Sequence, residues 1–225
     1  MSLTRTVATP SAALFDLDGT LVDTEMRSRT AWHRLFTTHG VPCDAALLAT
    51  FAGRRGHEVL TERLHLFPEG STVDALFDQA VSFLSDPGMP AARPVPGAAE
   101  LVRDLHVRGV PAGVVTSALR VDAEAMLDML GVREFLTVLV TAEDVRSGKP
   151  DPEGYLTGCA ALGVAPEHVV GFEDAPPGVA AVKAAGMFCV GITTSQPAAA
   201  LDAADLIVTD LTQVAWPPAR TEERR

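Results

Sequence analysis

The chain has 225 residues, of which 47% are hydrophobic and 21% charged, and its net charge is −11. These values are typical of one globular domain, or of one domain with a smaller insertion. Nucleic-acid-binding proteins usually carry a basic patch, and the chain has no basic run before its last few residues, so we expect no nucleic-acid partner. No stretch approaches the ~18 consecutive apolar residues of a membrane span, so we expect no membrane partner.

The first residues and the cysteines indicate where the protein works. Residues 1–15 contain no long apolar core, so a secretory signal peptide is not expected. Cys43, Cys159 and Cys189 are widely spaced and odd in number, which fits neither a disulfide framework nor a metal knuckle. They are typical of small buried side chains in a reducing compartment. We therefore predict a soluble cytoplasmic protein.

The first part of the chain combines one short strand with several helices. Residues 11–16 form an apolar run that ends in a polar turn, as a buried strand does. From about 24 to 39 the apolar residues recur at helical spacing. Segment 85–97 is rich in proline and indicates a connector. Three further helical stretches are expected before it, at about 44–50, 56–66 and 71–85.

After the connector, predicted strands alternate with predicted helices. The strands are expected within "VPAGVVTSA", "FLTVLVT", "HVVGF", "MFCVGI" and "DLIVT". Such alternation implies right-handed crossovers and a parallel sheet covered on both faces. The predicted fold class is α/β, a Rossmann-like parallel sheet with a small all-α insertion after its first strand. We predict an α/β core of residues 1–22 and 92–225, and a helical cap of residues 23–91.

Polar residues gather where the predicted strands end. The carboxyl ends of parallel strands meet at one edge of the sheet, where ligands bind. Four carboxylates at that edge would repel one another strongly unless a divalent cation lay among them. Oxygen ligands, with no His or Cys at metal-ligand spacing nearby, favour Mg²⁺ over Zn²⁺. The residues are Asp16 and Asp18 in "LFDLDGTLVDTE", Thr116 and Ser117 after the next strand, Lys149 before a helix, and Glu173 and Asp174 after the fourth strand.

These residue types suit one kind of chemistry. One carboxylate can act as a nucleophile and another as a proton donor, while the metal neutralises the site and an incoming phosphate. The lysine adds a positive charge, and the threonine hydroxyl can donate a hydrogen bond to a phosphoryl oxygen.

Four segments resemble, in order and spacing, the motifs of haloacid-dehalogenase-superfamily phosphatases with a small (C1-type) helical cap. They are "DLDGTLVDT", "VVTSA", "GKPDPEGYL" and "GFEDAPPGV", and the resemblance covers about residues 11–210. "TAEDVRSGKPDPEGYL" and "FEDAPPGVAAVKAAG" are most similar to sugar-phosphate and polyol-phosphate phosphatases related to β-phosphoglucomutase. The resemblance implies a Mg²⁺-dependent phosphatase that hydrolyses a small sugar or polyol phosphate through an aspartyl-phosphate intermediate.

The resemblance also implies a role for each matching residue. Asp16 would attack phosphorus, and Asp18 would protonate the leaving alcohol and later deprotonate the attacking water. Thr116 and Lys149 would hold the phosphoryl group. The metal would be bound by Asp16, the Asp18 main-chain carbonyl and Asp174, with Glu173 as a ligand or a support. The remaining substrate-binding residues would be Ser117, and Gly19 and Thr20, which would shape the turn with their backbone amides facing the phosphate.

The predicted cap contains one candidate substrate contact, "FAGRRGHEVL" at 51–60. Two adjacent arginines and a histidine follow a glycine there, and related caps place a substrate-specificity loop in this position. We predict that Arg55, and after it His57, contacts the non-phosphate end of the substrate. A solvated charge run is the alternative interpretation.

A β-phosphoglucomutase-like phosphomutase is the nearest alternative function. Mutases of this family carry a cap-hinge histidine ten residues after the general acid, and that position is Ser28 here. They also use a cap lysine, whereas residues 24–91 contain no lysine. Both absences favour the phosphatase. A dehalogenase is disfavoured by Asp18, because such enzymes lack the second aspartate.

Outside the enzymes, the alternative is a phosphate-accepting or phosphate-binding module. Receiver domains also gather carboxylates and magnesium at the edge of a parallel sheet, but they lack an inserted cap, so the four motifs together favour an enzyme. Simpler local interpretations are a hairpin turn at "DLDG", a helix N-cap at Thr116–Ser117 and a solvated charge at Lys149. The expected partner is a small phosphorylated substrate, and we expect a monomer, with a dimer as the alternative.

Overall fold

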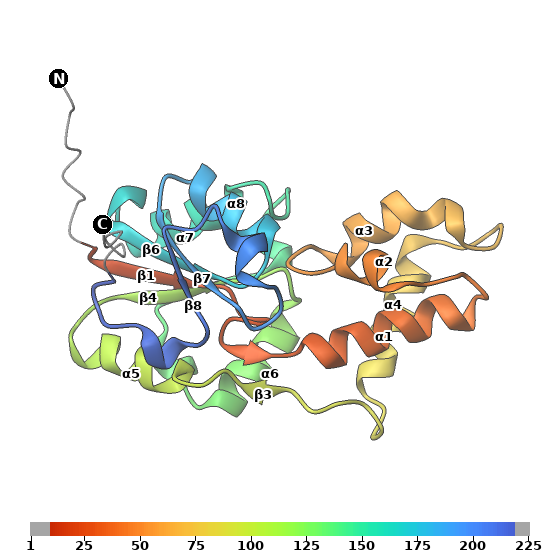
Figure 1. Ribbon diagram of the computed structural model, residues 1–225, viewed down its shortest axis with the longest axis horizontal. Coiled ribbons are helices and arrows are strands. Elements are labelled where there is room, and N and C mark those ends of the chain that lie inside the picture. The colour runs from red at the N-terminus through yellow and green to blue at the C-terminus, as the bar shows by residue number, and fades with distance from the viewer. Residues whose placement is uncertain (1–9, 219–225) are drawn as a thin grey trace.

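A six-stranded parallel sheet forms the larger part of the computed structural model, which describes residues 10–218 (Figure 1). Its strand order is β5-β4-β1-β6-β7-β8, and every neighbouring pair is parallel. The predicted α/β fold with a Rossmann-like sheet is therefore confirmed. The strands are β1 (Ala12–Phe15), β4 (Ala112–Val115), β5 (Val138–Val140), β6 (Val169–Glu173), β7 (Phe188–Ile192) and β8 (Leu206–Val208).

Strand β1 is central because it is apolar on both faces. All four of its residues are fully buried, and it pairs with β4 on one side and β6 on the other. Side chains alternate between the faces of a strand. Accordingly Ala13 and Phe15 join one apolar cluster, and Ala12 and Leu14 join the other.

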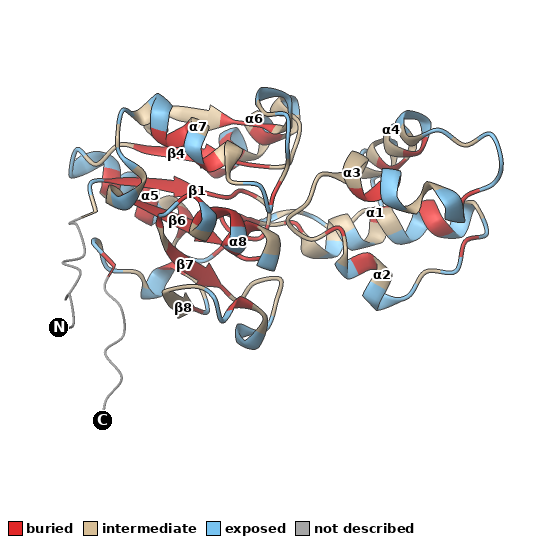
Figure 2. Ribbon diagram, turned by 90° about the horizontal axis from the view of Figure 1, so that it is seen from above, coloured by how far each residue is buried: buried red, intermediate tan, exposed pale blue. Residues whose placement is uncertain are grey.

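Helices cover both faces of this sheet. Helices α5 (Ala98–Val107) and α6 (Arg120–Leu130) pack into the cluster around Phe15, and α7 (Glu153–Leu162) and α8 (Pro176–Ala184) pack into the cluster around Leu14. The sheet is therefore sandwiched between the two helix pairs, and its inner strands β1, β4 and β6 are buried (Figure 2). Short 3₁₀ helices lie in the connections, at Arg133–Phe135, Ala142–Asp144, Pro166–His168, Ala198–Leu201 and Leu211–Gln213.

Between β1 and β4 the chain forms a separate helical lobe at the carboxyl end of the sheet (Figure 1). Its helices pack around an apolar cluster of their own, in which Phe36, Leu60 and Leu76 are almost fully buried. The predicted helical insertion is thus present, and the boundaries proposed for it, 23 and 91, stay a prediction. The lobe contains α1 (Glu25–Thr38), α2 (Ala45–Ala49), α3 (Gly56–Arg63), the 3₁₀ helix Leu64–Leu66 and α4 (Val73–Leu84).

A two-stranded antiparallel ribbon joins the lobe to the core, and the sequence did not predict it. In this ribbon Val22 pairs with Pro94 and Asp23 with Arg93, as strands β2 (Val22–Asp23) and β3 (Arg93–Pro94). Strands of two residues are too short to show a periodic pattern. The ribbon holds the two chain crossings together at the base of the lobe.

Within residues 10–218, no helix combines the length and apolarity needed to cross a bilayer. The start of the chain, where no signal peptide is expected, lies largely outside the described residues. So do residues 219–225 of the predicted core.

Candidate functional site

The acidic residues that follow β1 and β6 lie together, because the two strands are neighbours in register. Phe15 pairs with Phe172, and the main-chain N–H of Asp16 donates to the carbonyl of Phe172 at 2.9 Å. Asp16, Glu173 and Asp174 are buried, and each offers a carboxylate oxygen within 4.8 Å of the others. Three buried carboxylates this close repel one another, so the site needs compensating positive charge.

Lys149 supplies part of that charge. Its Nζ lies 2.5 Å from Asp16 Oδ1 and 2.7 Å from Glu173 Oε1, and it donates to the carbonyl of Val115 at 3.1 Å. Burial alone would lower the pKa of Lys149, but the charges of Asp16 and Glu173 outweigh burial and raise that pKa above its usual range. Lys149 is therefore a buried cation, and its interpretation as a solvated charge is wrong.

Glu173 is held by a residue that sequence reasoning missed. The Tyr155 hydroxyl, on α7, donates to Glu173 Oε1 at 2.6 Å, and both side chains are fully buried. Burial and the charge of Asp16 raise the pKa of Glu173 to about 7, although Lys149 opposes this rise. The sequence signal for this role was weak. Tyr155 is the only tyrosine of the chain and lies in the "GKPDPEGYL" motif, but nothing in the sequence links it to Glu173.

Two carboxylate oxygens in the cluster have no hydrogen-bond partner among the described residues, Asp174 Oδ1 and Glu173 Oε2. Burial and the charges of Asp16 and Glu173 raise the pKa of Asp174 well above its usual range. An unpartnered buried carboxylate oxygen is costly unless a ligand binds it. The donor set consists of oxygen atoms alone, which fits a hard divalent cation such as Mg²⁺.

Asp18 lies just beyond this cluster and is half-buried. Its Oδ1 accepts a hydrogen bond from the Thr24 hydroxyl at 2.7 Å. Burial and the charge of Asp16 raise the pKa of Asp18 to about 6. A carboxyl group with a pKa close to neutrality can give and take a proton at physiological pH.

Gly19 and Thr20 form the turn that follows, as expected. Gly19 has a φ of +85°, and a Cβ there would lie 1.9 Å from Asp174 Oδ2, so the turn requires glycine. The Gly19 N–H donates to the Val22 carbonyl at 2.7 Å, and the Thr20 N–H to the Leu17 carbonyl at 3.3 Å. Both amides thus have main-chain acceptors, and their predicted orientation towards the phosphate stays a prediction.

Thr116 and Ser117 follow β4 but do not cap a helix, because α6 begins at Arg120 with Leu119 before it. The N-cap interpretation is therefore wrong. Thr116 is buried, and its Oγ1 accepts a hydrogen bond from the Ala118 N–H at 3.0 Å. The Ser117 hydroxyl donates to the carbonyl of Gly53 in the helical lobe at 3.3 Å, so it contacts the lobe.

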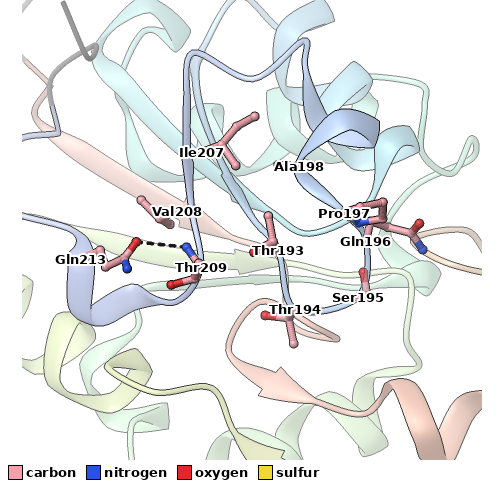
Figure 3. A pocket seen from close by; sticks show the side chains of 10 residues that line it. All are labelled: Thr193, Thr194, Ser195, Gln196, Pro197, Ala198, Ile207, Val208, Thr209 and Gln213. Atoms are coloured by element: carbon pink, nitrogen blue, oxygen red, sulfur yellow. Dashed lines mark hydrogen bonds between the residues drawn. The ribbon is translucent and has the colours of Figure 1, made fainter.

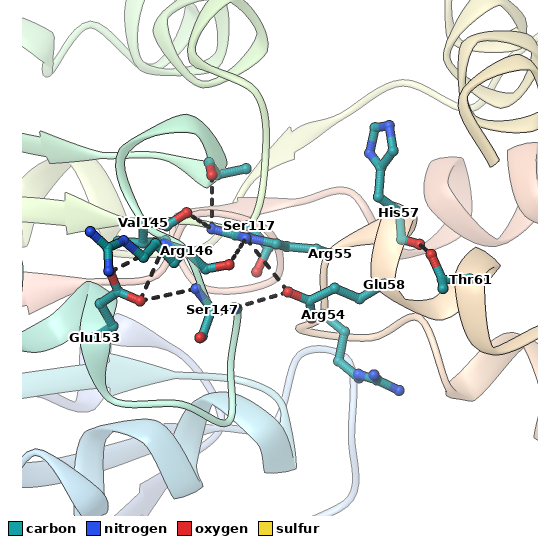
Figure 4. Close-up of polar contacts among 12 residues, drawn as sticks. Arg54, Arg55, His57, Glu58, Thr61, Ser117, Val145, Arg146, Ser147 and Glu153 are labelled. Atoms are coloured by element: carbon teal, nitrogen blue, oxygen red, sulfur yellow. Dashed lines mark hydrogen bonds and ion pairs between the residues drawn. The ribbon is translucent and has the colours of Figure 1, made fainter.

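Arg55 binds the core, whereas His57 stays on the lobe (Figure 4). The Arg55 guanidinium donates to main-chain carbonyls of the loop between β5 and α7 at 2.8–3.1 Å, so it is not a solvated charge. The His57 ring lies 3.9 Å from the Phe77 ring and points away from this contact. Contact of either residue with the substrate stays a prediction.

Two cavities adjoin the site. One, of about 600 Å³, opens at the carboxyl ends of β7 and β8 among hydroxyl and amide side chains (Figure 3). Among its lining residues is Ser195, whose hydroxyl donates to the Asp174 carbonyl at 3.0 Å. The other lies between Arg55, Thr116 and Lys149 and has about 10 Å³, room for no more than about one water. This second cavity is therefore too small for a sugar phosphate.

The sequence profile of the haloacid dehalogenase-like hydrolases matches residues 10–186. The chain belongs to this family. Among solved structures, the β-phosphoglucomutase of Clostridium difficile superposes on this haloacid dehalogenase-like chain with a TM-score of 0.79. The alignment covers 92% of this chain and 94% of that one at 24% identity, which shows the fold alone.

Two sequence relatives of this haloacid dehalogenase-like hydrolase carry phosphatase names. Validoxylamine A 7'-phosphate phosphatase of Streptomyces hygroscopicus subsp. limoneus is 50% identical over 205 residues, which are 91% of this chain and 96% of the relative. Hexitol phosphatase A of Escherichia coli K12 is 33% identical over 205 residues, 89% and 91% of the two chains. The predicted resemblance to phosphatases of this superfamily is thereby confirmed.

Gly178→Ala should disrupt the site of this hydrolase, although alanine favours helices. A Cβ at position 178 would lie 1.9 Å from Glu173 Cδ, so Glu173 must leave Lys149 and Tyr155. Helix propensity alone would stabilise the variant by about 1 kcal/mol. We expect a lower melting temperature and a large loss of turnover. Gly88→Ala is the control, because the nearest atom to a Cβ there is 3.5 Å away; equal behaviour of the two variants would contradict this geometry.

Proposed function

We propose that this haloacid dehalogenase-like hydrolase is a Mg²⁺-dependent phosphatase of a small sugar or polyol phosphate. The observation that carries the proposal is Asp16, buried at the carboxyl end of the sheet between Lys149 and two further carboxylates. Its setting suits a nucleophile, because the carboxylate is held in one orientation and lies beside a fixed positive charge. Phosphatase names among relatives of 50% and 33% identity support the same reaction class.

The metal would be held by Asp16, Asp174 and the main-chain carbonyl of Asp18, with Glu173 as a ligand or a support. Support comes from the unpartnered oxygens Asp174 Oδ1 and Glu173 Oε2 and from the all-oxygen donor set. When bound, Mg²⁺ would neutralise the cluster and stabilise negative charge on the phosphoryl group.

The first half of the reaction transfers the phosphoryl group to Asp16. A carboxylate oxygen of Asp16 attacks phosphorus, and the bond between phosphorus and the sugar oxygen breaks. Asp18 gives its proton to that leaving oxygen, so the product departs as an alcohol. Lys149, 2.5 Å from Asp16 Oδ1, offers positive charge to the phosphoryl oxygens, and the Thr116 hydroxyl can donate to one of them.

The second half returns Asp16 to its free form. Asp18, now a carboxylate, takes a proton from water, and the water oxygen attacks phosphorus. The bond between phosphorus and Asp16 breaks, inorganic phosphate leaves, and Asp18 again holds a proton. The pKa of about 6 suits Asp18 to both roles near neutral pH.

Hydrolysis is favoured over phosphoryl return to the sugar by the composition of the lobe. The position where mutases of the family carry a hinge histidine is Ser28, and residues 24–91 contain no lysine. Asp18 and the lobe together disfavour a non-catalytic phosphate-binding module. We also propose that the protein is cytoplasmic and monomeric.

Turnover should release inorganic phosphate from one or more phosphorylated sugars or polyols, and only with Mg²⁺. A screen of such compounds with a phosphate assay and product chromatography tests this. Activity should vanish in chelator and return with Mg²⁺, because the uncompensated carboxylates repel a phosphate. Full activity in chelator would contradict the metal assignment, and an isomeric sugar phosphate as the product would favour the mutase.

Asp16→Asn should abolish turnover, because the amide is a poor nucleophile. Asp18→Asn should lower kcat by roughly 10²–10⁴-fold, the usual contribution of general acid–base catalysis. Asp23→Asn is the matched control, since the Asp23 carboxylate accepts the Glu25 N–H at the start of α1, a bond that asparagine can also accept. An Asp18→Asn enzyme within about tenfold of wild type would remove Asp18 from proton transfer.

A further inference from the structure

The helical lobe binds the loop that directly precedes Lys149. This loop runs from 142 to 148, between β5 and α7. From the lobe, the Arg55 guanidinium donates to three of its main-chain carbonyls (Figure 4). The acceptors are Ala142 at 2.8 Å, Val145 at 2.8 Å and Arg146 at 3.1 Å.

Glu58 makes a second contact with the same loop. Its Oε1 accepts a hydrogen bond from the Gly148 N–H at 2.9 Å, and it lies 3.5 Å from the Arg55 guanidinium. A Cβ at Gly148 would lie 2.8 Å from Glu58 Oε1 and 2.9 Å from Arg55 Cδ. A side chain at residue 148 would therefore displace Glu58 and Arg55 from these contacts.

The core holds the opposite side of the loop. The Glu153 carboxylate, at the start of α7, accepts the N–H groups of Arg146 and Ser147 at 2.9–3.2 Å (Figure 4). The loop thus lies between Glu153 in the core and Arg55 and Glu58 in the lobe. Of these contacts, only those of Arg55 and Glu58 depend on where the lobe sits.

The guanidinium is well suited to fix the shape of the loop. Its N–H groups point in fixed directions in one plane, so three carbonyls can bind it together only in one arrangement. The Arg55 side chain is only 14% exposed, so water does not readily replace these bonds. The next residue after the loop is Lys149, whose Nζ must stay beside Asp16.

We propose that Arg55 and Glu58 are positioning residues for Lys149. Docking of the lobe sets loop 142–148, and the loop holds Lys149 where it meets Asp16 and the phosphoryl group. The inference rests on the proposed phosphatase function and replaces the predicted contact of Arg55 with the distal end of the substrate. Its consequence is that Arg55 affects phosphoryl transfer from every substrate, whatever its size.

Steady-state kinetics of Arg55→Ala on two substrates test this inference. One substrate is the best sugar phosphate from the screen, and the other is a small aryl phosphate that has little surface for the lobe. We expect kcat to fall on both by a similar factor, on the order of 10- to 150-fold, with a much smaller change in KM. Arg55→Lys should be intermediate, because an ammonium lacks the planar fork.

The neighbouring arginine provides the matched control. Arg54 pairs with Glu62 inside the lobe, at 2.5 and 3.1 Å, so Arg54→Ala should leave kcat close to that of wild type. Added guanidinium ion, below unfolding concentrations, should restore part of kcat in Arg55→Ala and raise it in neither wild type nor Arg54→Ala. Hydrogen exchange at 142–149 should be faster in Arg55→Ala than in Arg54→Ala.

Several outcomes would overturn the inference. A loss on the sugar phosphate alone would make Arg55 a specificity residue, and no loss on either substrate would leave it without a role in turnover. Unchanged hydrogen exchange at 142–149 would show that Arg55 does not order the loop. A lower melting temperature with no rescue by guanidinium would reduce Arg55 to a structural role. If wild type releases no phosphate from any substrate, the proposed function fails instead, and hydrogen exchange still decides whether Arg55 orders the loop.

Discussion

The ion pairs of Lys149 with Asp16 and Glu173 are the interactions on which the rest of the site depends. Moving charged groups out of water costs several kcal/mol for each ion, and only close, well-bonded partners offset that cost. Lys149 partners two carboxylates at 2.5 and 2.7 Å, and Tyr155 gives Glu173 a further donor. Asp174 remains uncompensated, which is why we propose a cation there. The backbone accommodates the cluster by glycine at 19 and 178, where a Cβ would strike a carboxylate.

The helical lobe is inserted where it can contact both Asp18 and the loop that precedes Lys149. Because the loop after β1 leads into the lobe, Thr24, the residue before α1, donates its hydroxyl to Asp18 Oδ1 at 2.7 Å. The lobe also contacts the loop before Lys149, through Arg55. Under our proposal, the position of the lobe therefore affects both Asp18, the proton carrier, and Lys149, which binds the phosphoryl group.

The sequence predicted the site residues that directly follow the strands of the parallel sheet. The carboxyl ends of parallel strands share one edge, so the pattern of β1 and β6 was enough to bring Asp16 and Asp174 together. Three features were not predictable. The β2–β3 ribbon is too short for periodicity, and the Tyr155–Glu173 bond depends on how α7 packs on the sheet. The partners of Arg55 are main-chain carbonyls, which leave no trace in side-chain identity.

Phosphorylation of Asp16 during turnover tests the proposed chemistry most directly. Wild type mixed with Mg²⁺ and its best substrate is quenched in acid within one turnover and then reduced with borohydride, which converts an aspartyl phosphate to homoserine. Mass spectrometry of the peptide that contains residues 14–25 then locates the change. Nucleophilic attack by Asp16 predicts homoserine at position 16, and none in enzyme quenched without substrate. Homoserine in place of another aspartate would contradict attack by Asp16. So would unmodified Asp16, provided that phosphoryl transfer to the enzyme is faster than hydrolysis of the phosphoenzyme under the conditions of the quench.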